Sequence, residues 1–145
     1  WYGEVDGVRQ VAEGLWQGDI SDLNVLKLPE VQKKFGFTLA VNVGSTNFVP
    51  PNMFAVHLPM MDDSRFEKND WTRIFILMRL VLEEIRRGGK VFVSCDAGLS
   101  RSIVFSGMLI SVIERRPMDD QLMKEVGGDP LPELWQNAAN AMKLW

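Results

Sequence analysis

The residues whose types and spacing could do chemistry are gathered in one segment, Cys95-Asp96-Ala97-Gly98-Leu99-Ser100-Arg101-Ser102. Residues 90–94 (KVFVS), just before it, are typical of a buried strand, and residues 102–114, after it, of an apolar helix. The first N–H groups of a helix have no partners within the helix, and they lie at the positive end of its dipole. A loop wrapped over that end can aim several N–H groups at one anion. The segment therefore predicts a phosphate site made by Asp96, Ala97, Gly98, Leu99, Ser100 and Arg101.

The same electric field acts on Cys95, at the start of this loop. A helix N-terminus and a nearby arginine favour the thiolate, which is the nucleophilic form of cysteine. Gly98 allows the backbone to curl, and Arg101 can hold two phosphate oxygens with its planar guanidinium. Attack of the thiolate on phosphorus would give a phosphocysteine. The competing interpretation is a buried thiol at a strand end with a packing role alone, but the spacing of Gly98 and Arg101 favours the catalytic one.

At these residues the sequence resembles the cysteine-dependent protein phosphatases, and specifically the small dual-specificity phosphatases. The family pattern His-Cys-x5-Arg-Ser/Thr is matched by Ser94-Cys95-x5-Arg101-Ser102. Residues 14–18 (GLWQG) are similar to an early strand of the family, and residues 39–43 (LAVNV) to its next core strand. The resemblance implies a protein-tyrosine-phosphatase-like fold and hydrolysis of phosphotyrosine and phosphoserine/threonine in proteins, without cofactor or metal. It also implies that Ser102 donates a hydrogen bond to the Cys95 sulfur.

The resemblance further implies a general acid on a loop before the cysteine. The family pattern Ile-Pro-x-x-Asp is matched by Leu58-Pro59-Met60-Met61-Asp62, so Asp62 is the expected acid. Asp63 is the alternative, because a loop alignment is easily displaced by one residue. A carboxylic acid in this place would protonate the leaving oxygen of the ester. Both residues could instead be solvated loop carboxylates.

Two positions depart from the family pattern. Ser94 stands where the family has histidine and carries no cationic form, so we expect the Cys95 thiolate to be less favoured than is usual for the family. Asp96 adds a negative charge to the loop, which disfavours polyanionic substrates. Two alternatives to a protein phosphatase stay open: a phosphate-binding pseudophosphatase without turnover, and a phosphatase acting on a nucleotide or lipid.

The pattern of elements around this segment predicts an α/β domain. Two short strands joined around residues 13–14 are expected within residues 7–18, and further strands at 37–43, 54–58 and 90–94. Helices are expected at 22–34, with a break at Pro29, at 69–87, at 102–114, from Pro117, and after Asp129. Alternating strands and helices favour a twisted central mixed sheet flanked by helices, as one domain over residues 1–145.

The composition of the chain limits the classes of partner that it is expected to bind. The chain of 145 residues has 16 Lys plus Arg against 19 Asp plus Glu, a net charge of -3, which argues against a general nucleic-acid binder. No run approaches the roughly 18 apolar residues of a membrane span. With Cys95 and His57 the sole cysteine and histidine, a disulfide within the chain is impossible and a Cys/His zinc site is not expected. We expect a cytoplasmic protein.

Overall fold

The computed structural model describes residues 8–61 and 70–145. Its strands and helices follow one another in the order β1 (Arg9–Ala12), β2 (Leu15–Gly18), α1 (Ile20–Val25), α2 (Pro29–Phe35), β3 (Leu39–Asn42), β4 (Ala55–His57), α3 (Trp71–Arg86), β5 (Val91–Ser94), α4 (Arg101–Glu114), α5 (Asp120–Val126) and α6 (Pro132–Ala141), with a final 3-10 turn at Met142–Leu144. The observed elements match the expected ones, and the segment 22–34 divides into two helices at Pro29 as predicted.

The strands form one mixed sheet in the order β1-β2-β5-β3-β4. β1 pairs antiparallel with β2, whereas β2, β5, β3 and β4 are all parallel to one another. Ser94, the last residue of the central strand β5, lies level with Gly18 on β2 and Asn42 on β3. The carboxyl ends of three adjacent strands therefore meet where the chain leaves β5, which is the edge where α/β sheets bind ligands.

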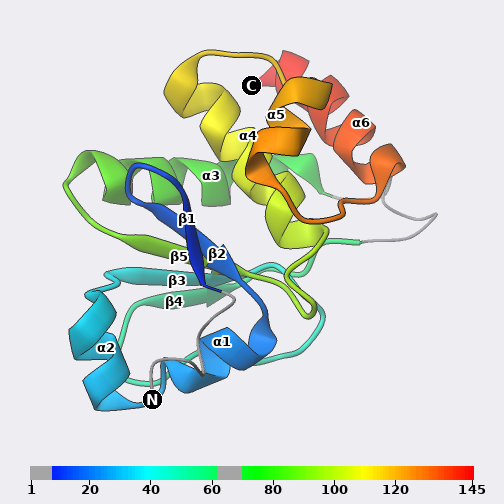
Figure 1. Cartoon of the computed structure of the whole chain (residues 1–145). Helices are drawn as coiled ribbons and strands as arrows, with labels where there is room; N and C mark the ends of the chain where they lie inside the picture. The colour runs from blue at the N-terminus through cyan, green and yellow to red at the C-terminus, as the bar shows by residue number, and fades with distance from the viewer. Residues whose placement is uncertain (1–7, 62–69) are drawn as a thin grey trace.

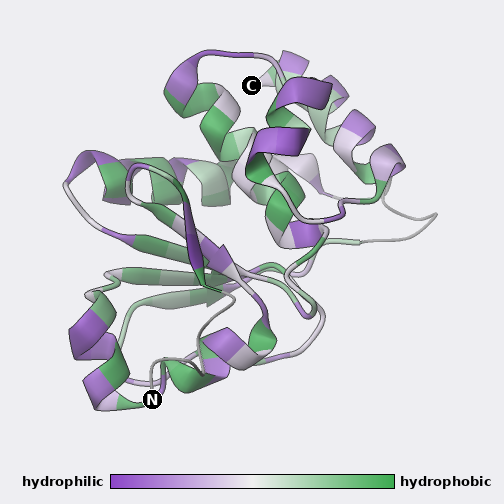
Figure 2. Cartoon of the chain, viewed as in Figure 1, coloured by the Kyte–Doolittle hydropathy of each residue, from purple (hydrophilic) through white to green (hydrophobic). Residues whose placement is uncertain are grey.

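Helices cover both faces of the sheet: α3 to α6 lie over one face, and α1 and α2 over the other (Figure 1). Side chains alternate accordingly along β5, where Val91 and Val93 belong to the core under α3 and α4 while Phe92 belongs to the core under α1 and α2. A strand buried on both faces is apolar throughout, as the sequence of β5 is. Figure 2 shows the apolar residues concentrated on the sheet and on the helix faces that meet it.

The helix boundaries have local causes. α1 begins after Asp19, whose carboxylate accepts from the Asp22 N–H while the Asp22 carboxylate accepts from the Asp19 N–H. α3 begins after Asp70, which accepts from the Arg73 N–H. The predicted fold class, a mixed sheet flanked by helices, is confirmed. Within the described residues, no helix has the length and hydrophobicity to cross a bilayer.

Candidate active site

Cys95 lies directly between the central strand and the helix that follows it. β5 ends at Ser94 and α4 begins at Arg101, so the six residues 95–100 form the whole connection. The Cys95 side chain is 2% exposed and belongs to the apolar core beneath α4. The sheet thus delivers the thiol to the N-terminal end of a 14-residue helix.

The backbone of this connection turns its carbonyl groups outward. The Asp96 carbonyl accepts from the Ile20 N–H of α1 at 3.3 Å, and the Leu99 carbonyl accepts from the Asp129 N–H at 2.8 Å. In the described part of the chain, no group accepts from the N–H of Ala97 or Gly98. A loop with bonded carbonyls outside and unbonded N–H groups is the arrangement that binds anions.

Gly98 makes this curl possible. Its φ is +70°, and a Cβ there would lie 2.9 Å from the backbone carbonyl of Gly18. A side chain would therefore meet both an unfavourable backbone conformation and the end of β2. The glycine expected from the sequence is required here for two separate reasons.

Ser102, in the first turn of α4, lies against the thiol. The Cys95 Sγ is 3.2 Å from the Ser102 Oγ, and the Ser102 Oγ is 2.9 Å from the Oε1 of Gln17 on β2. Ser102 is fully buried and Gln17 is 3% exposed. The structure therefore places Ser102 next to the sulfur, with the thiol donating to the serine and the serine donating to Gln17. Donation from Ser102 to an ionised sulfur stays a prediction.

Arg101 is held at the rim of the loop. Its Nη2 donates to the Asp96 carboxylate at 2.9 Å and its Nη1 to the Ser45 hydroxyl at 2.7 Å. The planar guanidinium has a shape that suits phosphate oxygens. Asp96 and Ser45 thus orient the arginine whose position next to Cys95 was predicted from the spacing.

Asp96 also fastens a neighbouring loop. Its carboxylate accepts from the backbone N–H groups of Ser45 and Thr46 at 3.1 and 3.0 Å. Burial would raise the pKa of Asp96, but hydrogen bonds from Thr46, Ser45 and Arg101 outweigh it and lower this pKa from 3.8 to about 2. The Asp96 side chain, expected among the phosphate contacts, is therefore turned to the loop after β3 and to Arg101.

Hydrogen bonds from Asn42 and His57 also hold the loop after β3 in shape. The Asn42 side chain donates to the carbonyls of Thr46 and Phe48 and accepts from the Gly44 N–H. The Nε2 of His57 lies 2.7 Å from the Gly44 carbonyl. His57 thus contributes to the shape of this loop.

Ser94 occupies the family's histidine position at the end of β5. It is fully buried, and its hydroxyl has no hydrogen-bond partner among the described residues. Its neighbours in the sheet are Gly18 and Asn42.

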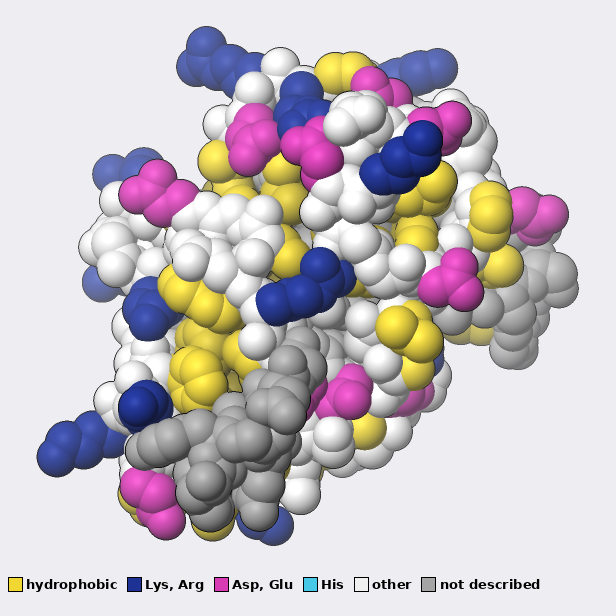
Figure 3. Space-filling view, viewed as in Figure 1, with side chains coloured by type: hydrophobic (Ala, Val, Ile, Leu, Met, Phe, Trp, Pro, Cys, Tyr) yellow, Lys and Arg dark blue, Asp and Glu magenta, His cyan; other side chains and the backbone are white. Residues whose placement is uncertain are grey.

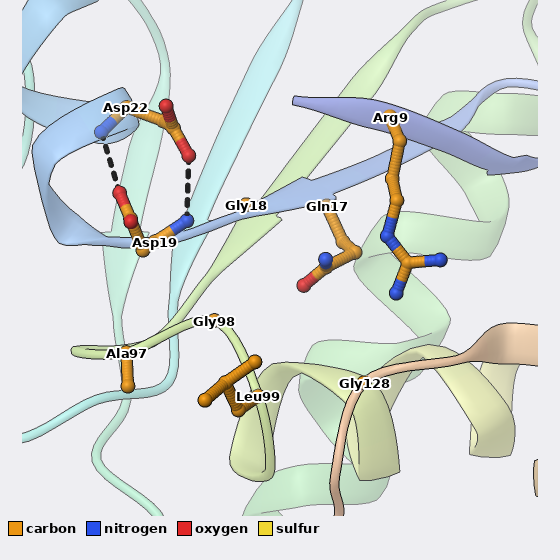
Figure 4. A pocket seen from close by; sticks show the side chains of 9 residues that line it. All are labelled: Arg9, Gln17, Gly18, Asp19, Asp22, Ala97, Gly98, Leu99 and Gly128. Atoms are coloured by element: carbon orange, nitrogen blue, oxygen red, sulfur yellow. Dashed lines mark hydrogen bonds between the residues drawn. The ribbon is translucent and has the colours of Figure 1, made fainter. Parts of the chain in front are cut away.

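A cavity of about 390 Å³ adjoins the outer side of the loop. Figure 4 shows it between the end of β2, the loop and the segment after α5, with Gln17 directed from β2 toward the loop. Its lining residues are Arg9, Gln17, Gly18, Asp19, Asp22, Ala97, Gly98, Leu99 and Gly128. Gln17 is therefore both a neighbour of Ser102 and part of the cavity wall.

The expected general acid, Asp62, and its alternative, Asp63, both lie outside the described residues. Over residues 8–61 and 70–145, no group of three or more His, Cys, Asp and Glu side chains is placed to hold a metal ion. Two residues at the site were not expected from the sequence, Gln17 and Ser45. Gln17 could have been found by its pattern, because it is a polar residue on the core-facing side of an otherwise apolar strand.

With this geometry in hand, comparison with solved structures gives clear matches. Human DUSP28 is 20% identical with a TM-score of 0.78, over 95% of this chain and 94% of that one. The human tyrosine phosphatase-like serine/threonine/tyrosine-interacting protein is 21% identical with a TM-score of 0.78, over 94% and 96%. PTPMT1, solved in complex with PI(5)P, is 12% identical with a TM-score of 0.78, over 96% of both chains. The chain has the fold of these phosphatase-like proteins, as the sequence resemblance implied.

Sequence comparison is less specific. No family model matches the chain. A curated Caenorhabditis elegans protein described as "Uncharacterized protein ZK757.2" is 28% identical over 94 residues, which are 63% of this chain and 31% of that protein. The chain thus spans about a third of the length of the curated relative it matches.

Proposed function

We propose that the chain is a cysteine-dependent phosphatase that hydrolyses phosphate monoesters of phosphorylated protein side chains. The observation that carries the proposal is the position of Cys95: its thiol lies at the N-terminus of α4, within a loop whose carbonyls at Asp96 and Leu99 are bonded outward. This arrangement favours both a bound phosphate and an ionised nucleophile. The fold shared with dual-specificity phosphatases supports the same reaction class.

The proposed reaction has two steps. The Cys95 thiolate attacks phosphorus, forming an S–P bond and breaking the P–O bond of the ester, while Asp62 gives its proton to the leaving oxygen. Water then attacks phosphorus, an O–P bond forms, the S–P bond breaks and its electron pair returns to the sulfur, while Asp62 takes a proton from the water. Loop N–H groups and Arg101 stabilise the charge on the phosphoryl oxygens in both steps.

A phosphoprotein is preferred as substrate because the site offers few cations. Arg101 is held by Asp96, and the other variable loop positions, Ala97 and Leu99, are uncharged. The face in Figure 3 carries basic and acidic side chains interspersed, without a large positive area. A phosphoinositide or nucleotide with several phosphates would gain little from such a surface. The complex of PTPMT1 with PI(5)P makes a lipid phosphate the main alternative to include in a test.

Phosphate release from an aryl phosphate, measured with EDTA present, tests the reaction. We expect turnover by the wild type, its loss in Cys95→Ser, and a fall of about 100-fold or more in Asp62→Ala, the size of a missing general acid. Asp63→Ala is the matched control and should retain most of the rate. Turnover that survives Cys95→Ser would overturn the mechanism.

The substrate class is tested with the same enzyme on a panel. We expect phosphotyrosine and phosphothreonine peptides to be hydrolysed faster than a phosphoinositide in vesicles or a nucleoside monophosphate. The reverse order would reassign the substrate and keep the mechanism.

One observation favours a second function, phosphate binding without turnover: the buried hydroxyl of Ser94 offers Cys95 no cationic neighbour in place of the family's histidine. Wild type that binds phosphopeptide but releases no phosphate would establish that function.

A further inference from the structure

Behind the nucleophile, three buried side chains from separate elements form one hydrogen-bonded chain. The Cys95 Sγ, at the end of β5, is 3.2 Å from the Ser102 Oγ of α4, which is 2.9 Å from the Gln17 Oε1 of β2. All three residues are buried, with exposed fractions of 2%, 0% and 3%, and hydrogen bonds between buried groups are stronger than those in water. We propose that Gln17 is a positioning residue that directs the Ser102 hydroxyl hydrogen to the Cys95 thiolate.

The direction of each hydrogen bond depends on how many hydrogens the thiol, the hydroxyl and the amide oxygen can share. A serine hydroxyl has one hydrogen and two lone pairs. When Cys95 is a thiol, its S–H donates to Ser102, and the Ser102 O–H donates to the Gln17 Oε1. When Cys95 is a thiolate, its sulfur accepts only, so the Ser102 hydrogen must point to the sulfur. The Gln17 Oε1 would then face a lone pair of the Ser102 oxygen at 2.9 Å without a hydrogen between them.

A glutamine resolves this conflict because its amide carries an acceptor and a donor at equivalent ends. Half a turn of the amide places Nε2 where Oε1 was, and Nε2 then donates to the Ser102 oxygen. Figure 4 shows the Gln17 side chain beside the cavity, which provides room for the turn. In the thiolate state the chain then runs from Gln17 N–H to Ser102, and from Ser102 O–H to sulfur.

The direction of the effect follows from charge. Hydrogen bonds that end on an anion are roughly twice as strong as neutral ones, and each bond polarises the next. Gln17 therefore stabilises the thiolate more than the thiol. The same state is reached when the S–P bond of a phosphocysteine breaks and its electron pair returns to sulfur. This consequence rests on the proposed function, but the ionisation of Cys95 can be measured without any turnover.

The test is the pH dependence of Cys95 alkylation by iodoacetamide, which is specific because the chain has one cysteine. We expect Gln17→Met to raise the midpoint by about 0.5 to 1 pH unit and Ser102→Ala by about 1 unit. The double variant should shift no further than Ser102→Ala alone, because Gln17 acts through Ser102. Gln10→Met on the neighbouring strand makes the same chemical change at an exposed position and should leave the midpoint unchanged.

A measurement on the wild type tests the same proposal if one of the variants does not fold. The side-chain amide resonances of ¹⁵N-labelled Gln17 should shift with the alkylation midpoint of Cys95, and this shift should disappear in Ser102→Ala. An unchanged or lowered midpoint in folded Gln17→Met, additive shifts in the double variant, or amide resonances that ignore Cys95 ionisation would overturn the proposal. If aryl phosphate hydrolysis is absent while the midpoints behave as expected, the proposed function fails and this inference stands.

Discussion

At the scale of single residues, Asp96 joins the loop that follows Cys95 to the rest of the site. One carboxylate binds the Arg101 guanidinium and the backbone N–H groups of Ser45 and Thr46. These contacts fix the arginine in one orientation and hold the loop after β3 against the loop after β5. The sequence marks Asp96 as a loop residue with an unfavourable charge, and the structure adds that its carboxylate holds two loops and Arg101 together.

The lowered pKa of Asp96 gives a pH-dependent prediction. Because the pKa is about 2 in the folded protein and 3.8 ordinarily, the carboxylate adds stability above pH 3.8, which is lost as the pH falls toward 2. We expect Asp96→Asn to lower the free energy of unfolding at pH 7 by about 1 to 2 kcal/mol, a value reduced for partial exposure. The deficit should shrink between pH 4 and pH 2 in urea titrations. A deficit constant over that range would contradict the assignment; Asp120→Asn, at an exposed position of α5, is the control.

The single cysteine gives a second residue-scale prediction. Without another thiol in the chain, a sulfenic acid on Cys95 has no internal partner for a disulfide. We expect excess peroxide to inactivate the protein with poor recovery after treatment with thiol. Mass spectrometry of the Cys95 peptide should show sulfinic and sulfonic acids, and full recovery of activity would refute the prediction.

At the scale of elements, the site depends on how tightly the end of β2 packs against the loop after β5. The Ile20 N–H donates to the Asp96 carbonyl. A Cβ on Gly98 would lie too close to the backbone of Gly18. The absence of a side chain on Gly98 therefore allows the loop to pack closely, and this close packing fixes the distance between α1 and the loop. The N–H groups of the loop keep their direction for the same reason.

Gly98→Ala tests this packing. The variant adds the cost of a positive φ to a 2.9 Å approach to the Gly18 carbonyl, so we expect a loss of about 1 to 3 kcal/mol in stability and weaker binding of inorganic phosphate. Gly36→Ala is the matched control, with a φ of +69° and nothing within 4 Å of the added Cβ. It should lose about 1 kcal/mol from backbone strain alone and keep its affinity. Equal effects in both variants, by urea unfolding and calorimetry, would show that the close approach does not matter.

At the scale of the whole molecule, the layers on the two sides of the sheet contribute separate cores. The core under α3, α4 and α6 includes Cys95, whereas the core under α1 and α2 includes Phe92. Trp135 of α6 packs against α4 so closely that a Cβ on Gly107 would lie 2.6 Å from its ring. The Trp135 ring therefore helps to hold the helix that carries the site.

We expect Trp135→Ala to cost about 3 to 5 kcal/mol, as for other buried aromatic residues. Trp135→Phe should cost clearly less, because the buried Nε1 has no hydrogen-bond partner among the described residues and none is lost. Trp145→Ala, at a residue 39% exposed, is the control and should cost least. Urea unfolding gives the order, and a Trp135→Phe variant as unstable as Trp135→Ala would reveal a missing contact of the indole nitrogen.

The sequence by itself determined the elements and the loop from Cys95 to Arg101, because these depend on neighbouring residues. The apolar run of β5, the break at Pro29 and the spacing from Cys95 to Arg101 are local patterns. Each has a physical meaning that does not depend on distant parts of the chain. The fold class followed from their alternation and from the resemblance to known phosphatases.

The tertiary structure alone decided which distant side chains complete the site. Gln17 and Ser102 are 85 residues apart, and Ser45 lies 56 residues before Arg101. They meet because β2, β5 and β3 are adjacent parallel strands whose carboxyl ends share one edge of the sheet. Strand order is set by packing of whole layers, for which no local pattern gives a signal. For that reason the partners of Cys95 and Arg101 became visible only in the folded chain.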